Sequence, residues 1–419
     1  MPEIYSKYLS DPEIAACCSD EQFIRHMLNA EIALAEAQAQ LGVIPKKAAR
    51  EIAQVLEGGQ PDSTQLADGT LANGIPIIPL LAIVKQKLSA ETQDYLHWGA
   101  TSQDIVDTAN VMIIRDVLKI IKIRLEEIIK HLKTLSNKHQ QTLTVARTRT
   151  QQAVPITYAQ KIDNWRIPLE RHLKRLDQLR PRLLVVQLGG AGGNLSVLGE
   201  LGADTARLMA ERLNLGYIGV WHNQRDNLVE FSNWLALLTG SLGKMAQDIL
   251  LLAQTEVGEI VENAEGGGGS STMPHKNNPV LSEATVALSR YVGQLAGANF
   301  QTILHQHERD GASWALEWLT YPQMMMATGS ALNHALTISK NMQINKAAVR
   351  ANLEKLNGLV FSERASFILA EYRSRKEAKK IVSEACELAL AENIHLAEAL
   401  IKLVPELDID WKEQLASNQ

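Results

Sequence analysis

The sequence predicts an all-α protein built around a bundle of long helices. Aromatic residues make up only 5% of the 419 residues, and residues that favour helices, above all Ala, Leu, Ile, Glu, Lys and Gln, dominate the composition. Apolar residues recur at steps of three and four over segments much longer than an average helix. The alternation typical of strands is hard to find. Helices that are apolar over more than one face need neighbours on several sides, which favours a bundle.

Five long helices are expected in the middle of the chain. They are predicted over residues 105–139, 156–179, 227–261, 280–304 and 316–341. In the first, the apolar residues at helical spacing are Val111, Ile114, Leu118, Ile121, Leu125 and Ile128. Pro168 should kink the second helix, because its ring clashes with the preceding turn.

Smaller helical units are expected on both sides of this bundle. The predicted domains are an N-terminal helical domain over residues 1–95, a central bundle over 96–343 that carries the sequence motifs, and a C-terminal helical domain over 344–419. Turn signals at Gly58–Pro61 and at Asn73-Gly74 punctuate the first domain. In the last, Ser374 and Glu377 stand three residues apart and predict a capping box ahead of an amphipathic helix.

Charge and cysteine content exclude several classes of protein. The formal net charge of −5 argues against a nucleic-acid partner, which requires a basic face. A site for an anion must therefore be a local positive feature. The three cysteines, Cys17, Cys18 and Cys386, form no CxxC pair and no disulfide framework, which favours a reducing compartment.

The sequence indicates a cytoplasmic protein without a membrane partner. The first residues, MPEIYSKYLSDPE, have acidic residues and lack the apolar core of a signal peptide. The most apolar region, residues 235–253, contains Lys244, Gln247 and Asp248, so it is not expected to span a membrane.

The most informative segment is GGGGSSTMPHKNNP, from Gly266 to Pro279. Four consecutive glycines raise the entropy cost of ordering the backbone, which predicts a segment that moves. Ser270 and Ser271 follow, and then Lys276 and Asn278. A mobile loop that delivers a hydroxyl beside a fixed cation suits chemistry on an anionic substrate. The alternative is a flexible linker, although linkers are Gly/Ser repeats without an embedded Met-Pro-His-Lys-Asn.

This loop resembles the signature of the fumarase/aspartase superfamily, G-S-S-x-M-P-x-K-x-N-P, which Gly269 to Pro279 match without a gap. HWGATSQDIVDT at residues 97–108 and RTRTQQAVPIT at 147–157 resemble the first and second conserved regions of that superfamily. The resemblance covers nearly the whole chain. It implies a fumarase/aspartase-like fold with a small N-terminal domain, a central five-helix bundle and a small C-terminal domain. It also implies a homotetramer with shared active sites.

The resemblance also implies roles for individual residues. Ser270 would remove a proton alpha to a carboxylate with Ser271 beside it, and Lys276 would help to hold the resulting aci-carboxylate. These three form the expected catalytic set. The expected substrate-binding residues are His97, Thr101, Ser102, Arg147, Thr148, Arg149, Gln151, Met273, Asn278 and Arg309. Thr101 and Ser102 also suit the N-terminus of the long helix, and the two roles are compatible.

One departure from the superfamily pattern is informative. Many members have a histidine after Arg-Thr that assists the departure of a hydroxide or an amine, and here Arg149 stands at that position. Arginine cannot be deprotonated, but it can grip a carboxylate with two parallel hydrogen bonds. It therefore suits a reaction whose leaving group is a carboxylate. Some cycloisomerases have a histidine three residues later, where this chain has Gln152. The alternative for Arg149 is a surface ion pair.

A second departure argues against nucleotide substrates. Adenylosuccinate lyases follow H-E-R-D with a serine-rich segment and an arginine that hold a phosphate, and here Trp314 and Trp318 replace a serine and the arginine after Arg309-Asp310. These features, together with WHNQRD at residues 221–226, resemble the 3-carboxy-cis,cis-muconate cycloisomerase family. That family closes a tricarboxylate diene into a lactone in the β-ketoadipate pathway. A fumarate-releasing lyase and a non-catalytic descendant are the alternatives.

No cofactor and no metal are expected. The glycine-rich segment 189–194 lacks the GxGxxG spacing and no strand precedes it, which predicts a mobile turn between helices. His305 and His307 are not spaced as in HEXXH, so they do not predict a metal site. The expected partner is a small tricarboxylate substrate.

Overall fold

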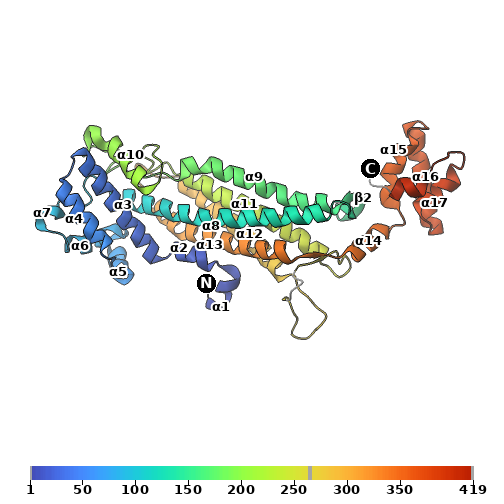
Figure 1. Ribbon diagram of the computed structural model, residues 1–419, viewed down its shortest axis with the longest axis horizontal. Coiled ribbons are helices and arrows are strands. Elements are labelled where there is room, and N and C mark those ends of the chain that lie inside the picture. The colour runs from blue at the N-terminus through green and yellow to red at the C-terminus, as the bar shows by residue number, and fades with distance from the viewer. Residues whose placement is uncertain (1, 263–266, 417–419) are drawn as a thin grey trace. The chain divides into compact units, whose positions relative to one another are not determined.

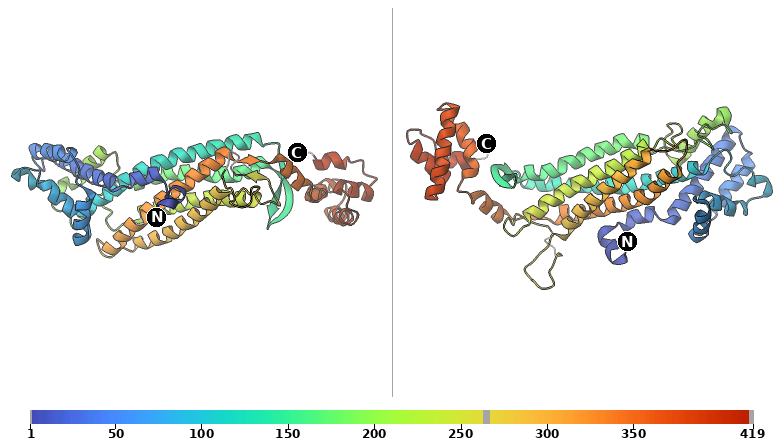
Figure 2. Two further views of the ribbon diagram at one scale, coloured as in Figure 1. Left: turned by 90° about the horizontal axis from the view of Figure 1, so that it is seen from below. Right: turned by 180° about the vertical axis from the view of Figure 1, so that it is seen from behind.

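The computed structural model describes residues 2–262 and 267–416, and its elements are almost all helices (Figure 1). The predicted all-α class with five long helices is confirmed. These helices are α8 (Ser102–Lys138), α9 (Tyr158–Leu183), α11 (Asp226–Leu252), α12 (Val280–Phe300) and α13 (Gly311–Asn341). Figure 2 shows the same helices from two further sides.

The chain forms two compact units. Unit 1 consists of Met1–Glu126, Glu170–Gly243 and Ala284–His334, and unit 2 of Glu127–Leu169, Lys244–Glu283 and Ala335–Gln419. Each of the five long helices contributes residues to both. The predicted division into three domains at residues 95 and 343 stays a prediction.

Unit 1 contains most of the shorter helices. They are α1 (Glu3–Leu9), α2 (Pro12–Cys17), α3 (Asp20–Leu41), α4 (Lys46–Glu57), α5 (Ser63–Asn73), α6 (Ile77–Lys85), α7 (Ala90–Gln93) and α10 (Gly202–Leu213). Short 3-10 turns cover Gly199–Leu201 and Gln301–Ile303. The predicted breaks are confirmed, because Gly58 is the C-terminal cap of α4 and Gly74 is that of α5.

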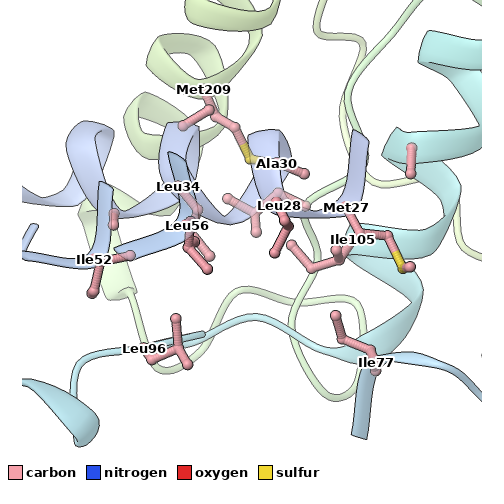
Figure 3. Packing of buried hydrophobic residues seen from close by; sticks show 14 of the residues in the cluster. Met27, Leu28, Ala30, Leu34, Ile52, Leu56, Ile77, Leu96, Ile105 and Met209 are labelled. Atoms are coloured by element: carbon pink, nitrogen blue, oxygen red, sulfur yellow. The ribbon is translucent and has the colours of Figure 1, made fainter. Parts of the chain in front are cut away.

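The core of unit 1 is built on α3. In Figure 3, Leu28 and Leu34 of this helix lie with Leu56 of α4, Ile105 of α8 and Met209 of α10, and all five side chains are buried. Burial of a large aliphatic side chain stabilises a fold by about 1.5–3 kcal/mol, so this contact attaches the first residues of α8 firmly to the N-terminal helices.

Unit 2 combines two short sheets with the C-terminal helices. Strands β1 (Leu143–Thr148) and β2 (Gln151–Thr157) form a hairpin, and β3 (Ile260–Val261) pairs with β4 (Gln343–Ile344). The helices are α14 (Lys346–Glu354), α15 (Ser362–Leu369), α16 (Arg375–Glu392), α17 (Leu396–Leu403) and α18 (Trp411–Ala416), and a 3-10 turn covers Leu359–Phe361. The capping box of Ser374 and Glu377 is confirmed at the start of α16.

The hairpin is a pair of strands that the sequence pattern, in which strand-like alternation is hard to find, did not indicate. Antiparallel pairing of Thr148 with Gln151 leaves Arg149 and Thr150 as a two-residue turn, with φ of 49° and 69°. Turns with two positive φ angles match the twist of the flanking strands. As a result, α9 begins at Tyr158 rather than at residue 156, and it continues through Pro168 to Leu183.

Two further helix boundaries differ from the predicted ones by five residues or more. The helix expected over 227–261 ends at Leu252, and Gly258, with φ of 61°, lies between it and β3. The helix expected to begin at 316 begins at Gly311, because Asp310 accepts hydrogen bonds from the N–H groups of Ala312 and Ser313. A carboxylate in this position caps a helix.

The apolar helix α11 is long and apolar enough to cross a membrane, judged by length and composition alone. Half of its most apolar window is nevertheless buried within the structure. Its fully buried side chains include Phe231, Leu235, Leu238 and Leu242, and its Trp234 donates a hydrogen bond to the carbonyl of His172 in α9. These contacts are typical of a core helix in a packed bundle.

Candidate active site

In unit 1, the candidate site begins at the N-terminus of α8. The helix starts at Ser102, which makes Thr101 its N-terminal flanking residue, as the sequence predicts. The N–H of Thr101 donates to the Asp104 carboxylate at 2.9 Å. The first N–H groups of a helix and its dipole favour an anion at this end. The Thr101 and Ser102 side chains therefore lie where an anionic group is favoured.

Asp104 is the centre of this part of the molecule. Its carboxylate is fully buried and also accepts from the N–H groups of Gly189 and Gly190, at 2.8 and 2.9 Å. The ring of His222, itself buried, contacts the same carboxylate through Nε2 at 2.7 Å. Hydrogen bonds to a charged acceptor are roughly twice as strong as neutral ones. The glycine-rich turn, residues 189–194, is thus bonded to a carboxylate of the protein itself. Two of its N–H groups are therefore not available to bind a ligand.

Arg309 lies against the same region. Its Nε donates to Gln103 Oε1 at 2.9 Å, and its Nη2 donates to the carbonyl of Ala191 at 3.2 Å. The Gln103 side chain in turn donates to the carbonyl of His222 at 2.9 Å. Two expected substrate-binding residues, Thr101 and Arg309, therefore belong to one hydrogen-bonded assembly, and Ser102 lies next to Gln103 in the sequence.

The WHNQRD motif continues into a buried charge cluster. Arg225 is 1% exposed and bonds both Asp107, at 2.7 Å, and Glu317. Burial alone would lower the pKa of Arg225, but these two carboxylates raise it well above its ordinary value. Trp314 donates its indole N–H to Asp107 at 2.9 Å and packs edge-on against Trp318. Trp314 is thus buried beside a carboxylate, and neither tryptophan supplies the positive charge that a phosphate site needs.

His97 is held by a buried carboxylate. Its Nδ1 lies 2.6 Å from Oε1 of Glu31, which is 2% exposed. Burial acts to lower the pKa of His97, yet the nearby Glu31 charge raises it overall. His97 has φ of 62°, a conformation that few residues other than glycine adopt. The ring is therefore orientated by Glu31.

In unit 2, the hairpin carries the second group of candidate residues. Arg147 bonds Glu259 at 2.6 Å, and Asn352 donates to the same Glu259 oxygen at 2.9 Å. Because Glu259 is fully buried, this ion pair anchors the hairpin internally. The amide nitrogen of Gln152 donates to the carbonyl of Asn352 at 3.0 Å, while its Oε1 is buried without a partner among the described residues.

The tip of the hairpin is exposed to solvent, unlike its base. Thr148, Arg149 and Gln151 are exposed. Arg149 makes no ion pair with any residue in the described ranges 2–262 and 267–416, so the surface ion pair considered from the sequence is not formed there. Arg149 is thus exposed at the tip, whereas Gln152 is bonded to Asn352 through its amide nitrogen.

The third group lies on the loop before α12, drawn as coil in Figure 2. Gly266 falls outside the described residues, and Gly267–Pro279 are described. A bridge joins Gly269 to Asn277, and the N–H of Asn278 donates to the carbonyl of Gly268 at 2.8 Å. The structure thus places Ser270, Ser271, Met273, Lys276 and Asn278 on one closed loop.

Within the loop, the two serines differ. Ser270 is half-buried, and its Oγ accepts from the N–H of Met273 at 3.1 Å, whereas Ser271 is exposed. The side chains of Met273 and Lys276 are exposed as well. Buried Glu262 accepts from the N–H groups of Leu281 and Ser282, which fixes the start of α12. The loop is therefore attached firmly at its C-terminal end.

Sequence reasoning missed several residues of these assemblies. Asp104, His222 and Glu259 each bond partners more than 80 residues away. The signal for Asp104 was its place three residues after Thr101, where an acid accepts from the N–H at the helix start. Within residues 2–262 and 267–416, no group of three His, Cys, Asp or Glu side chains is arranged to hold a metal.

Comparison with known proteins places these features in a family. A family model described as Lyase matches residues 10–293. The chain is 35% identical over 407 residues to the 3-carboxy-cis,cis-muconate cycloisomerase of Acinetobacter baylyi, covering 96% of this chain and 90% of that protein.

Solved structures agree with the sequence comparison. The 3-carboxy-cis,cis-muconate lactonizing enzyme from Pseudomonas putida has a TM-score of 0.91 and 35% identity, with 99% of this chain and 94% of that chain covered. A fumarate lyase from Mesorhizobium sp. BNC1 has a TM-score of 0.91 and 35% identity, with coverage of 97% and 94%.

Proposed function

The chain belongs to the lyase family of the fumarase/aspartase superfamily, and we propose that it is the cycloisomerase that converts 3-carboxy-cis,cis-muconate to 4-carboxymuconolactone. The observation that carries this proposal is Arg149. It replaces the histidine that assists departure of an amine or hydroxide, and it stands exposed at the tip of a hairpin whose base is fixed by Glu259. A guanidinium in this position suits a carboxylate that attacks or leaves.

The reaction divides into bond formation and proton transfer. One carboxylate oxygen of the substrate forms a C–O bond to an alkene carbon, and the electron pair of the double bond moves into the conjugated carboxylate. The resulting aci-carboxylate then takes a proton at its alpha carbon. In the reverse direction the alpha proton is removed and the internal carboxylate is expelled.

The candidate residues fit these two events. Arg149 binds the ring-closing carboxylate through two hydrogen bonds and fixes its orientation, which holds the attacking oxygen close to the alkene carbon. Ser270 carries the proton to and from the alpha carbon, while Lys276 and Asn278 stabilise the charge that develops on the aci-carboxylate. A serine hydroxyl needs an environment that activates it, and exclusion of water by the loop would supply part of that.

The remaining candidate residues bind the other carboxylates. Thr101 and Ser102 offer hydroxyls at the N-terminus of α8, where the helix dipole favours an anion. Arg309 adds a cation beside the same helix end through its bond to Gln103. His97, Arg147, Thr148, Gln151 and Met273 complete the proposed substrate-binding set, with Ser271 next to the proton-transfer residue.

We also propose a cytoplasmic homotetramer whose active sites are shared between chains, acting in protocatechuate catabolism through the β-ketoadipate pathway without a cofactor. The candidate residues are divided between unit 1 and unit 2, which is compatible with a site completed by other copies. A fumarate-releasing lyase is the second candidate, favoured by the similarity to the fumarate lyase of Mesorhizobium sp. BNC1.

An ultraviolet assay tests the proposal. Purified protein should consume 3-carboxymuconate and should release no fumarate from aspartate-type adducts. Ser270→Ala should lower turnover by orders of magnitude with the melting temperature and assembly mass unchanged, and Thr272→Ala on the same loop is the matched control. Fumarate release with no lactonisation would support the second candidate. Near-native activity of Ser270→Ala would reject the role of Ser270, and a larger loss with Ser271→Ala would transfer that role to Ser271.

A further inference from the structure

Unit 1 contains a cavity of about 510 Å³ that none of the candidate active-site residues lines. Its walls come mainly from α3, α5, α8 and α13. The apolar part includes Ile24, Met27, Val106, Ile114, Trp318 and Met325. Concave, mainly apolar spaces of about 300–1,000 Å³ are typical of sites for small organic molecules. The cavity is thus large enough for a molecule of two fused rings.

The charge of the walls excludes the carboxylate substrates. The lining residues, all in the described part of unit 1, include no Lys, Arg or His. They include the acids Asp20, Asp107 and Glu317, of which the last two are paired with Arg225. An anion entering this space would lose its hydration without gaining a cation. The chemistry therefore favours a neutral molecule.

A few polar groups line the cavity without hydrogen-bond partners. The half-buried side chain of Asn110, one turn beyond Asp107 on α8, makes no hydrogen bond with the described residues. Trp318 and Tyr321 also line the cavity, and their indole N–H and hydroxyl are buried without a partner among those residues. Buried polar groups are nearly always paired in native proteins, so unpaired ones require an explanation. A ligand with a hydroxyl or carbonyl group would supply a partner.

We propose that this cavity is a second ligand site, separate from the active site, for a neutral and largely apolar small molecule with one hydroxyl or carbonyl group. The apolar walls provide the affinity, and the Asn110 amide, which both donates and accepts, orientates the polar group. The absence of cations from the lining residues, all of them in described segments of unit 1, separates its ligands from the tricarboxylate substrate.

A matched pair of probes tests this proposal on the full-length protein. 2-Naphthalenemethanol is neutral, whereas 2-naphthoate has a similar shape and carries a negative charge. Calorimetric titration should show saturable binding of the alcohol at one site per chain and at least tenfold weaker binding of the naphthoate. The alcohol should leave the KM for the carboxylate substrate unchanged, because the two sites are separate.

Two variants locate the binding. Ala67→Trp places an indole into the cavity from an exposed position on α5 and should weaken alcohol binding at least tenfold while retaining activity. Leu71→Trp is the control, because Leu71 lies on the same helix, is 89% exposed and does not line the cavity. Asn110→Ala should weaken binding of the alcohol several-fold, which gives a second test should Ala67→Trp fold poorly.

Several results would overturn the proposal. These are no saturable binding of the alcohol up to its solubility limit, equal binding of the alcohol and the naphthoate, or equal effects of Ala67→Trp and Leu71→Trp. Competition between the alcohol and the substrate would assign the binding to the active site. A change in assembly mass caused by Ala67→Trp alone would mark this face as an interface between copies of the chain.

Discussion

Gly189→Ala should disturb the Asp104 assembly, because a methyl group at this position meets the His222 ring. A Cβ at this position would lie 2.6 Å from Cγ1 of Val220 and 2.7 Å from Cε1 of His222. Real Cβ contacts are not this short, so a neighbour must move. Because the His222 ring is only 3% exposed, its displacement also strains the 2.7 Å contact with Asp104.

The expected loss of stability follows from two contributions. Overpacking of a close-packed interior costs about 1–3 kcal/mol. Weakening a hydrogen bond to a charged group adds up to about 1.5–3 kcal/mol. The two overlap, because one movement of His222 relieves the clash and breaks the bond, so we expect the free energy of unfolding to fall by about 3 kcal/mol. Since Thr101 is bound to the same carboxylate, kcat/KM should fall by about 10²-fold, the size expected of a misplacement near 1 Å.

Gly192→Ala is the matched control. Gly192 belongs to the same turn, and a Cβ there would have no atom within 4 Å. Urea unfolding and steady-state kinetics of both variants form the assay. Gly192→Ala should stay within about 1 kcal/mol of the parent protein, since removing a glycine mainly restricts the unfolded chain. If Gly189→Ala is as stable and as active as Gly192→Ala, the turn relaxes without moving His222, and the assigned role of this assembly is wrong.

Four further outcomes are expected. Arg149→Lys keeps the charge but loses the two-pronged grip, so lactonisation should fall by about two orders of magnitude, or about 2.7 kcal/mol of barrier; wild-type rates would make Arg149 a bystander. Glu259→Gln removes a buried charge from Arg147 and should lower the free energy of unfolding by about 3–5 kcal/mol, measured by urea unfolding against the exposed control Glu363→Gln. Burial, together with the nearby Arg175 and Arg171, lowers the pKa of His172 to about 4. Below pH 6.5 the unfolded chain therefore binds a proton at His172 that the folded chain does not bind, and the free energy of unfolding should fall by about 2 kcal/mol between pH 7 and pH 5. In His172→Gln this dependence on pH should be smaller. Exhaustive chelation should leave the rate unchanged, and a loss of activity that one divalent ion restores would contradict the expectation of a metal-free enzyme.

The long helices could be predicted because their signal is local. Apolar residues at steps of three and four mark α8 to within three residues at its start and one at its end. The capping box at Ser374 is equally local, since both partners lie within one turn. The hairpin was missed because its turn lacks such a local signal. The turn is Arg149-Thr150, which contains no Gly or Asn to indicate positive φ.

The interior contacts of the site could not be predicted. Glu259 and Asp104 are charged residues, which are mostly exposed in proteins, and their burial depends on partners that are distant in sequence. Motif resemblance identified Thr101 and Arg309 as candidates, but not that Gln103 connects Arg309 to this region. A hydrogen bond between residues so far apart in the sequence leaves no periodic pattern from which it could be predicted.

The spread of Asp104's partners along the chain determines when during folding this carboxylate is satisfied. The glycine-rich turn lies 85 residues away and His222 lies 118 residues away, so two large loops must close before all of its hydrogen bonds exist. Closing such loops is entropically costly, and contacts of this kind form after the local helices. Substitutions at this carboxylate are therefore expected to accelerate unfolding more than they slow folding. On the ribosome, more than half of the chain must emerge before His222 can reach Asp104.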